Sequence, residues 1–193
     1  AVCAGFTLNV AEPHLTGPLG DAPIITHEAA TRETKMICGQ GPAPMGATIA
    51  HYRSLGLDLV PGAGFLAAVV PAAPDAWLTL LEQKGTMRLR DVLEPAIHYA
   101  ETGVPLVPNV IKTIETVVDL FREEWPTSAE LWLPGGNLPK AFALHCNPML
   151  AATWKRLLKE SEGGTREQEI RRARSCFYEG FIAEAVVAFN RNE

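Results

Sequence analysis

The side chains that could do chemistry are scattered along this chain rather than gathered into a known catalytic pattern. The histidines form no HExxH motif and no pair spaced by four residues, which are the arrangements typical of a zinc site. They stand at positions 14, 27, 51, 98 and 145. No serine lies in a G-x-S-x-G turn, and Gly39–Gly41 is too short for a dinucleotide or phosphate-binding loop. We therefore expect no metal, no cofactor and no complete catalytic set within this chain.

Other reactive groups also have simpler structural interpretations. Glu94 and Glu101 share one face of a predicted helix, where paired carboxylates are usually solvated, and His98 lies at the edge of that helix's apolar stripe. Cys176 adjoins Phe177 and is predicted to belong to the core. The cysteines, at positions 3, 38, 146 and 176, show no CxxC spacing and predict buried free thiols. This pattern favours a reducing compartment such as the cytoplasm, with the periplasm as the alternative.

Composition limits the class of partner. The chain has 193 residues with 47% hydrophobic and 20% charged side chains, which is typical of a folded globular protein. The net charge of −5 disfavours nucleic acid, and the arginines of 166–174 alternate with acids as on a solvated helix face. The longest apolar stretch, 65–73, is too short to cross a membrane and contains a proline. The first residue lies within an apolar element, which predicts that an upstream segment is missing.

The elements that must position these side chains fall into two parts, and together they predict an α+β fold in a single domain. Residues 1–74 hold a short apolar run at 4–10, readable as a helix or a buried strand, and two β-prone runs at 23–27 and 34–38. The polar stretch between those runs predicts an antiparallel hairpin. Gly/Pro-rich loops at 17–23 and 39–44 flank the hairpin and would bring backbone N–H groups together. Such a place suits a substrate carboxylate or an oxyanion, although plain connecting turns explain the loops equally well.

Residues 75–193 have a helical pattern. Apolar spacing predicts helices over 75–83, 89–100, 109–121, 148–160 and 181–189, and a capping-box signature at 165–168 starts another through residue 177. Pro95 should bend the second helix or mark a join, and Gly103 stands where a C-terminal cap belongs. The stretch 125–136 is predicted to be an irregular connector.

Several separated motifs are spread in one order over most of the chain. They are EPHLTG at Glu12–Gly17, PAIHYAETG at Pro95–Gly103, WLPGG at Trp132–Gly136, NPMLAATW at Asn147–Trp154 and FYEGFIAEAVV at Phe177–Val187. Together they resemble the large subunit of the γ-glutamyltransferase family, in which they occur in the same order and whose members are N-terminal-nucleophile hydrolases.

The resemblance implies a proenzyme that cleaves itself. The nucleophile would be the new N-terminal Thr of a small subunit, with its own α-amine as the base, so no catalytic residue is assigned to this chain. The fold would be part of a four-layer αββα sandwich, of which this chain contributes a mostly helical portion with an N-terminal β hairpin. The implied partners are the small subunit and a small amide substrate. The chain would then be a partial large subunit that lacks both ends.

One departure from the family pattern bears on specificity. In the family, an Arg in an RETAP stretch binds the α-carboxylate of the γ-glutamyl group, whereas the matching stretch here is QGPAP at Gln40–Pro44. A neutral amide cannot replace the paired bonds between a guanidinium and a carboxylate. Gln40 is predicted to line the acyl pocket, and acylases that cleave other amides become competitors to a γ-glutamyl enzyme. The alternative from another class is a helical interaction or scaffold module with no catalysis of its own.

Overall fold

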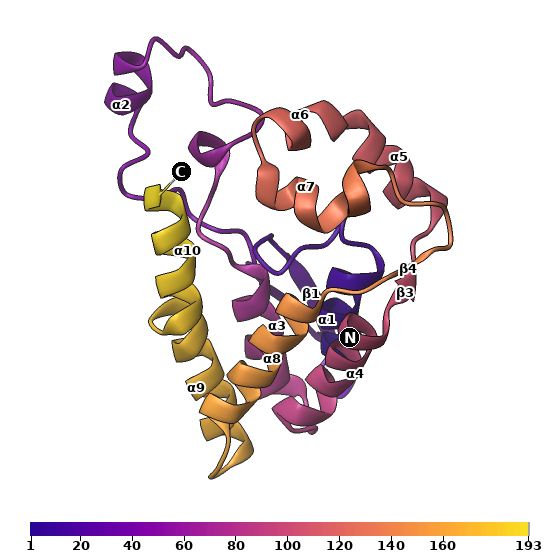
Figure 1. The fold of residues 1–193 in the computed structure, drawn as a ribbon. Coiled ribbons are helices and arrows are strands. Elements are labelled where there is room, and N and C mark those ends of the chain that lie inside the picture. The colour runs from indigo at the N-terminus through magenta and orange to yellow at the C-terminus, as the bar shows by residue number, and fades with distance from the viewer. Residues whose placement is uncertain (193) are drawn as a thin grey trace.

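A computed structural model describes residues 1–192 and contains a β hairpin packed beside a group of helices (Figure 1). The hairpin consists of β1 (Ile24–Glu28) and β2 (Glu33–Ile37), which pair antiparallel with Thr26 opposite Lys35. It confirms the hairpin predicted from the two β-prone runs. The described part of the chain is otherwise mainly helical.

The main core lies among five helices. Phe6 is fully buried in it, and its ring meets Trp77 and Trp154 edge-on at centroid distances of 5.0 and 5.5 Å. The helices are α1 (Val2–Ala11), α3 (Ala73–Lys84), α4 (Leu89–Thr102), α8 (Pro148–Ser161) and α9 (Arg166–Tyr178). Helix α1 packs on α3 and α4, α4 packs on α8, and α9 packs on α3 and α8. Such T-shaped aromatic pairs add about 0.5–1.5 kcal/mol each beyond the burial of their surface.

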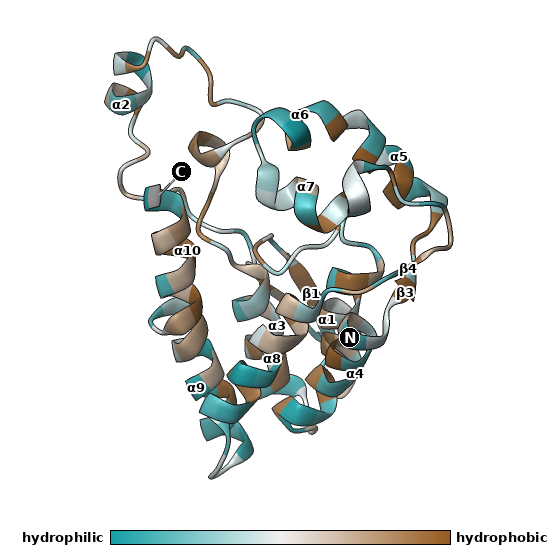
Figure 2. Ribbon diagram, viewed as in Figure 1, coloured by the Kyte–Doolittle hydropathy of each residue, from teal (hydrophilic) through white to brown (hydrophobic). Residues whose placement is uncertain are grey.

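The apolar run near the N-terminus is therefore a helix and not a strand. Helix α1 consists mainly of apolar residues, and Figure 2 shows much of its ribbon in brown. A helix that is hydrophobic all round must be enclosed to be stable. Although α1 precedes the predicted division at residue 74, it packs on helices that follow that division.

Helix α4 runs as one element through Pro95 and ends at Gly103, whose φ of 91° suits a residue without a Cβ. The predicted cap is confirmed, but Pro95 marks no join. Because Pro95 has no N–H, the helix lacks one backbone hydrogen bond at this point. The burial of Leu93, Ala96 and Ile97 around it offsets the free energy lost with that bond.

Two predictions fail in the region that follows α4. The single helix expected over 109–121 is broken at Val117 into α5 (Pro108–Thr116) and α6 (Val118–Glu123). The expected irregular connector contains α7 (Pro126–Trp132) and the short 3-10 turn η2 (Pro134–Gly136). A second small core explains both results, because it buries Val110 and Ile114 against Leu133 and so requires the chain to fold back. The two-residue strands β3 (Val104–Pro105) and β4 (Leu144–His145) join this unit to the main core.

The remaining elements lie at the surface. Helix α10 (Phe181–Asn192) packs on α9, while α2 (Ile49–Ser54) and the 3-10 turn η1 (Phe65–Ala67) belong to a long excursion between β2 and α3 (Figure 1). None of the described helices combines the length and apolarity needed to cross a membrane.

The cysteines are free thiols, as predicted, but the expected burial is wrong for two of them. Cys38 and Cys146 are exposed, and Cys3 and Cys176 are half-buried. The two exposed thiols directly follow the short strands β2 and β4.

Candidate active site

Three loops meet beside Gln40 and are held together by backbone hydrogen bonds. The N–H of Ala22 donates to the carbonyl of Gly39 (2.8 Å), and the N–H of Val70 donates to that of Pro42 (3.0 Å). The carbonyl of Gly20 accepts from the first residues of α3. The two Gly/Pro-rich loops therefore do lie side by side, as the sequence predicts.

The glycines on either side of Gln40 allow this close approach. A Cβ at Gly39 would collide with the carbonyl of Ala22, and a Cβ at Gly41 would collide with that of Val70. Neither clash could be relieved by moving a flexible side chain, because the obstacle is backbone in each case. The position of Gln40 is thus set by rigid backbone on both sides.

Gln40 lines a cleft of about 560 Å³ between this loop, the segment before α3, and α9. That volume is in the range of small-molecule sites. The α9 wall is polar and contributes Arg171, Arg174, Ser175 and Glu179. Gln40 is exposed at this cleft rather than turned into the core.

The two arginines of the cleft are engaged by carboxylates of α3. Arg171 Nε donates to Glu82 Oε1 (2.6 Å), and Arg174 Nε donates to Asp75 Oδ1 (2.6 Å). Arg174 Nη1 also lies 3.7 Å from Glu82 Oε2. The charges of the α9 wall are therefore largely compensated within the protein.

Tyr178 also lines the cleft. Its hydroxyl donates to the carbonyl of Pro71 (2.7 Å), which ties α9 to the segment before α3. Burial, with a smaller contribution from the charge of Asp75, raises the pKa of Tyr178 to about 12. The phenol consequently stays protonated and acts as a fixed donor at neutral pH.

The sequence predicted that the arginines of α9 lie on a solvated helix face. The structure shows instead that they bond to other parts of the protein. Besides Arg171 and Arg174, Arg166 donates to the last carbonyls of α3, at Leu81 (2.8 Å) and Glu82 (2.9 Å). A cation is favourable at the C-terminal end of a helix, where the carbonyls lack intrahelical partners. The spacing of Arg171 and Arg174 by three residues could have signalled one shared face.

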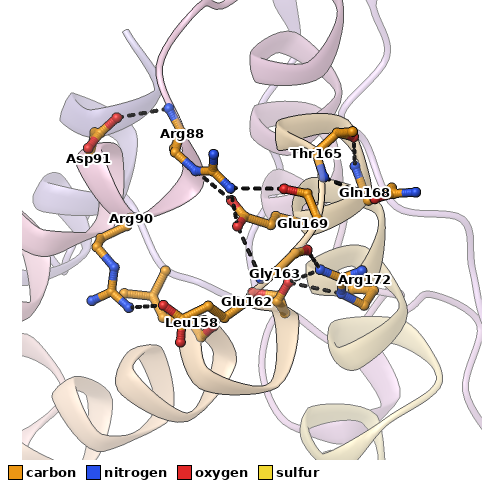
Figure 3. A network of polar contacts seen from close by, with 12 residues as sticks. Arg88, Arg90, Asp91, Leu158, Glu162, Gly163, Thr165, Gln168, Glu169 and Arg172 are labelled. Atoms are coloured by element: carbon orange, nitrogen blue, oxygen red, sulfur yellow. Dashed lines mark hydrogen bonds and ion pairs between the residues drawn. The ribbon is translucent and has the colours of Figure 1, made fainter.

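A second polar cluster connects α4 to the turn between α8 and α9, and Figure 3 shows its bonds. The buried carboxylate of Glu169 accepts from Arg88 Nε (3.1 Å) and Nη2 and from the N–H of Gly163 (3.2 Å). Arg172 donates to the carbonyl of Ser161, and Thr165 and Gln168 form the predicted capping box. The hydrogen bonds from Arg88 hold the pKa of Glu169 below its ordinary value. Every member serves the helix junction, so we assign this cluster a structural role.

The other sequence candidates stay apart from the cleft. Glu94 and Glu101 form ion pairs with Arg90 and Lys155, and His98 is exposed. Cys176 is half-buried, and burial raises the pKa of its thiol, which makes it a poor nucleophile. His145 stacks on Trp132, with ring centroids 4.6 Å apart. Within residues 1–192, no three His, Cys, Asp or Glu side chains are grouped as a metal site would require.

The family described as "Gamma-glutamyltranspeptidase" matches residues 1–193. The chain belongs to this family. The glutathione hydrolase-like YwrD proenzyme of Bacillus subtilis (strain 168) is 28% identical over all of this chain and 34% of its own length. The acylase ACY 1 proenzyme of Pseudomonas sp. (strain V22) is 34% identical over 71% of this chain and 26% of its own length.

Solved structures agree with this assignment. A structure of LmbA2991 is 54% identical, with a TM-score of 0.91 over 97% of this chain and 32% of its own. Cephalosporin acylase from Bacillus halodurans is 26% identical, with a TM-score of 0.83 over 98% of this chain and 34% of its own. The chain therefore spans about a quarter to a third of the length of these relatives.

Family members are N-terminal-nucleophile hydrolases and transferases, and the names of the relatives include both glutathione hydrolases and acylases made as proenzymes. The predicted family and the mostly helical fold with an N-terminal hairpin are confirmed.

Proposed function

We propose that this chain forms part of the large subunit of an autoprocessed amidohydrolase or acyltransferase, and that the cleft beside Gln40 receives the acyl group. The family match along the whole chain supports the proposal that this chain is part of a large subunit. The rigid glycine-flanked loop holds Gln40 at a cleft of small-molecule size. This geometry supports the proposal that the cleft receives the acyl group.

In this proposal the reacting atoms lie on a partner chain. The hydroxyl of an N-terminal Thr attacks the amide carbonyl while the α-amine of the same Thr takes its proton, and the amine product leaves. The resulting acyl ester passes to water or to an acceptor amine. Residues of the present chain bind and orient the acyl group and exclude competing substrates.

Gln40 sets the acyl preference in this scheme. Hydrogen bonds to a charged group contribute about 1.5–3 kcal/mol each, and a carboxamide cannot form the paired contact of a guanidinium with a carboxylate. The neutral side chain at this position therefore disfavours a γ-glutamyl group relative to acyl groups without an α-carboxylate.

The substitution Gln40→Arg tests this assignment. In the processed full-length enzyme we expect kcat/KM for a γ-glutamyl anilide to rise about tenfold, because one new charge-assisted bond forms. Gln83→Arg is the matched control, since Gln83 is exposed on α3 and does not line the cleft. If Gln40→Arg leaves γ-glutamyl and other amide substrates equally unaffected, the loop does not face the acyl group.

The processing step is tested separately by intact mass and N-terminal sequencing of the purified full-length protein. A second polypeptide that begins with Thr supports the autoprocessed enzyme. A single species without amidase activity would contradict it and favour the non-catalytic helical module.

A further inference from the structure

The charged groups of the cleft favour one sign of ligand charge. Four charged residues line it: Arg171, Arg174, Asp75 and Glu179. Glu82 stands just behind them, with its side chain 15% exposed, and accepts from Arg171 at 2.6 Å. Counting Glu82, two cations face three carboxylates, so the cleft has a net negative charge.

The charge of each arginine is already compensated by a carboxylate of α3, which weakens its attraction for a substrate carboxylate. The Nε edge of Arg171 is held by Glu82, and the Nε edge of Arg174 is held by Asp75. An incoming carboxylate would add to a guanidinium already neutralised, and it would be repelled by the nearby acid. The neutral lining groups, the amide of Gln40 and the hydroxyl of Ser175, supply no compensating charge.

Glu179 differs from the other acids of the cleft. Among the described residues no cation forms an ion pair with it, and it is exposed at the C-terminal cap of α9. The unsatisfied carbonyls at this end of the helix carry partial negative charge and add to that of the carboxylate. This corner of the cleft therefore attracts a cation.

We propose that the cleft selects an acyl group that carries a protonated amine and no free carboxylate, with Glu179 binding the ammonium group. The inference rests on the proposed function and names the substrate class for it. Tyr178 contributes as a positioning residue, since its bond to the carbonyl of Pro71 holds the segment before α3 against α9.

Three anilides separate the two charges of the acyl group. A γ-glutamyl p-nitroanilide carries both the amine and the carboxylate, 4-aminobutyryl p-nitroanilide lacks only the carboxylate, and glutaryl p-nitroanilide lacks only the amine. With the processed full-length enzyme, and with uncatalysed release subtracted, we expect kcat/KM to be highest for the 4-aminobutyryl compound and lowest for the glutaryl compound.

The substitution Glu179→Gln tests the named contact. An exposed ion pair contributes up to about 1 kcal/mol, so kcat/KM for the 4-aminobutyryl compound should fall about fivefold while that for the glutaryl compound does not fall. Glu115→Gln is the control, because Glu115 is an exposed glutamate on α5 outside the cleft, and it should change neither value. Circular dichroism of both variants verifies that the fold is retained.

The outcomes separate this inference from the proposed function. A processed enzyme that prefers the glutaryl compound, that accepts none of the three, or that responds to Glu179→Gln equally with all of them would overturn the inference alone. Absence of a Thr-initiated partner together with absence of amidase activity would overturn the proposed function and the inference with it.

Discussion

The five-helix core and the excursion between β2 and α3 contain similar apolar side chains but differ in how these are covered. In the core, Phe6 and Trp154 are almost fully buried. In the excursion, Met45 is 99% and Leu59 is 83% exposed. The comparison shows that burial depends on an available partner surface and not on hydrophobic composition alone.

Element length gives a physical reason for this difference. The core helices have 10 to 14 residues and present continuous apolar faces to one another. Helix α2 has 6 residues and η1 has 3. Helices this short are unstable alone in water and cannot form an apolar face that packs on a neighbour. The two ends of the excursion are joined to each other where the N–H of Val70 donates to the carbonyl of Pro42.

Removal of the central aromatic ring should have the largest effect. We expect Phe6→Ala to lower the free energy of unfolding by about 3–5 kcal/mol, because it leaves a cavity between Trp77 and Trp154. Urea unfolding followed by tryptophan fluorescence measures this change. A loss below about 1 kcal/mol would mean that the five helices do not share one core.

The junction of α4 with α9 should contribute less to the free energy of unfolding than the aromatic core does. Glu169→Gln removes the charge that accepts from Arg88 and Gly163, and we expect a loss of about 1.5–3 kcal/mol at pH 7. The pKa of Glu169 is lowered in the folded state, so the carboxylate stabilises the fold above its ordinary value of 4.5.

That contribution should be lost as the pH falls through the lower folded-state pKa. The difference in stability between Glu169→Gln and the parent protein should therefore shrink below about pH 4.5. A difference that stays constant from pH 7 to pH 3 would exclude a charge effect.

The close approach of the two ends of the excursion can be tested at Gly41. A methyl group there would meet the carbonyl of Val70, so Gly41→Ala should cost about 1–3 kcal/mol and displace the loop that carries Gln40. Gly46→Ala is the control, because a Cβ at Gly46 meets nothing within 4 Å. Equal thermal stability of the two variants would contradict the close approach.

The smallest change in the free energy of unfolding is expected for a substitution within the excursion itself. Phe65 is half-exposed and contacts the ring of Phe189 at a centroid distance of 6.0 Å, so Phe65→Ala should cost less than about 1 kcal/mol. The same unfolding assay measures it beside Phe6→Ala. A cost similar to that of Phe6→Ala would remove the distinction between the two regions.

Local signals predicted much of the fold. The β-prone runs of the hairpin, the glycine at the end of α4 and the capping box of α9 are all found where the sequence placed them. The break at Val117 and helix α7 were not predictable in this way. They result from the second core, which joins Val110 to Leu133 across the chain.

The candidate site likewise has residues that the sequence predicted and residues that it did not. The sequence predicted a site at Gln40 and its flanking loops, because glycine and proline mark turns and the family pattern marks the position, and the assignment of Gln40 to an acyl pocket stays a prediction. Tyr178, Arg171 and Glu179 were missed, since they are more than 130 residues from Gln40 in the chain. Their cleft exists only once α9 packs on α3.

Short-range propensities and ordered motifs were sufficient to predict the family and the helical nature of the larger part, and the neutral residue at position 40 is read directly from the sequence. They could not predict which arginines are neutralised or which carboxylate remains available. Those properties depend on distances between α3 and α9. The energy of an ion pair depends on its separation and solvent exposure, and neither is encoded in the spacing of residues along the chain.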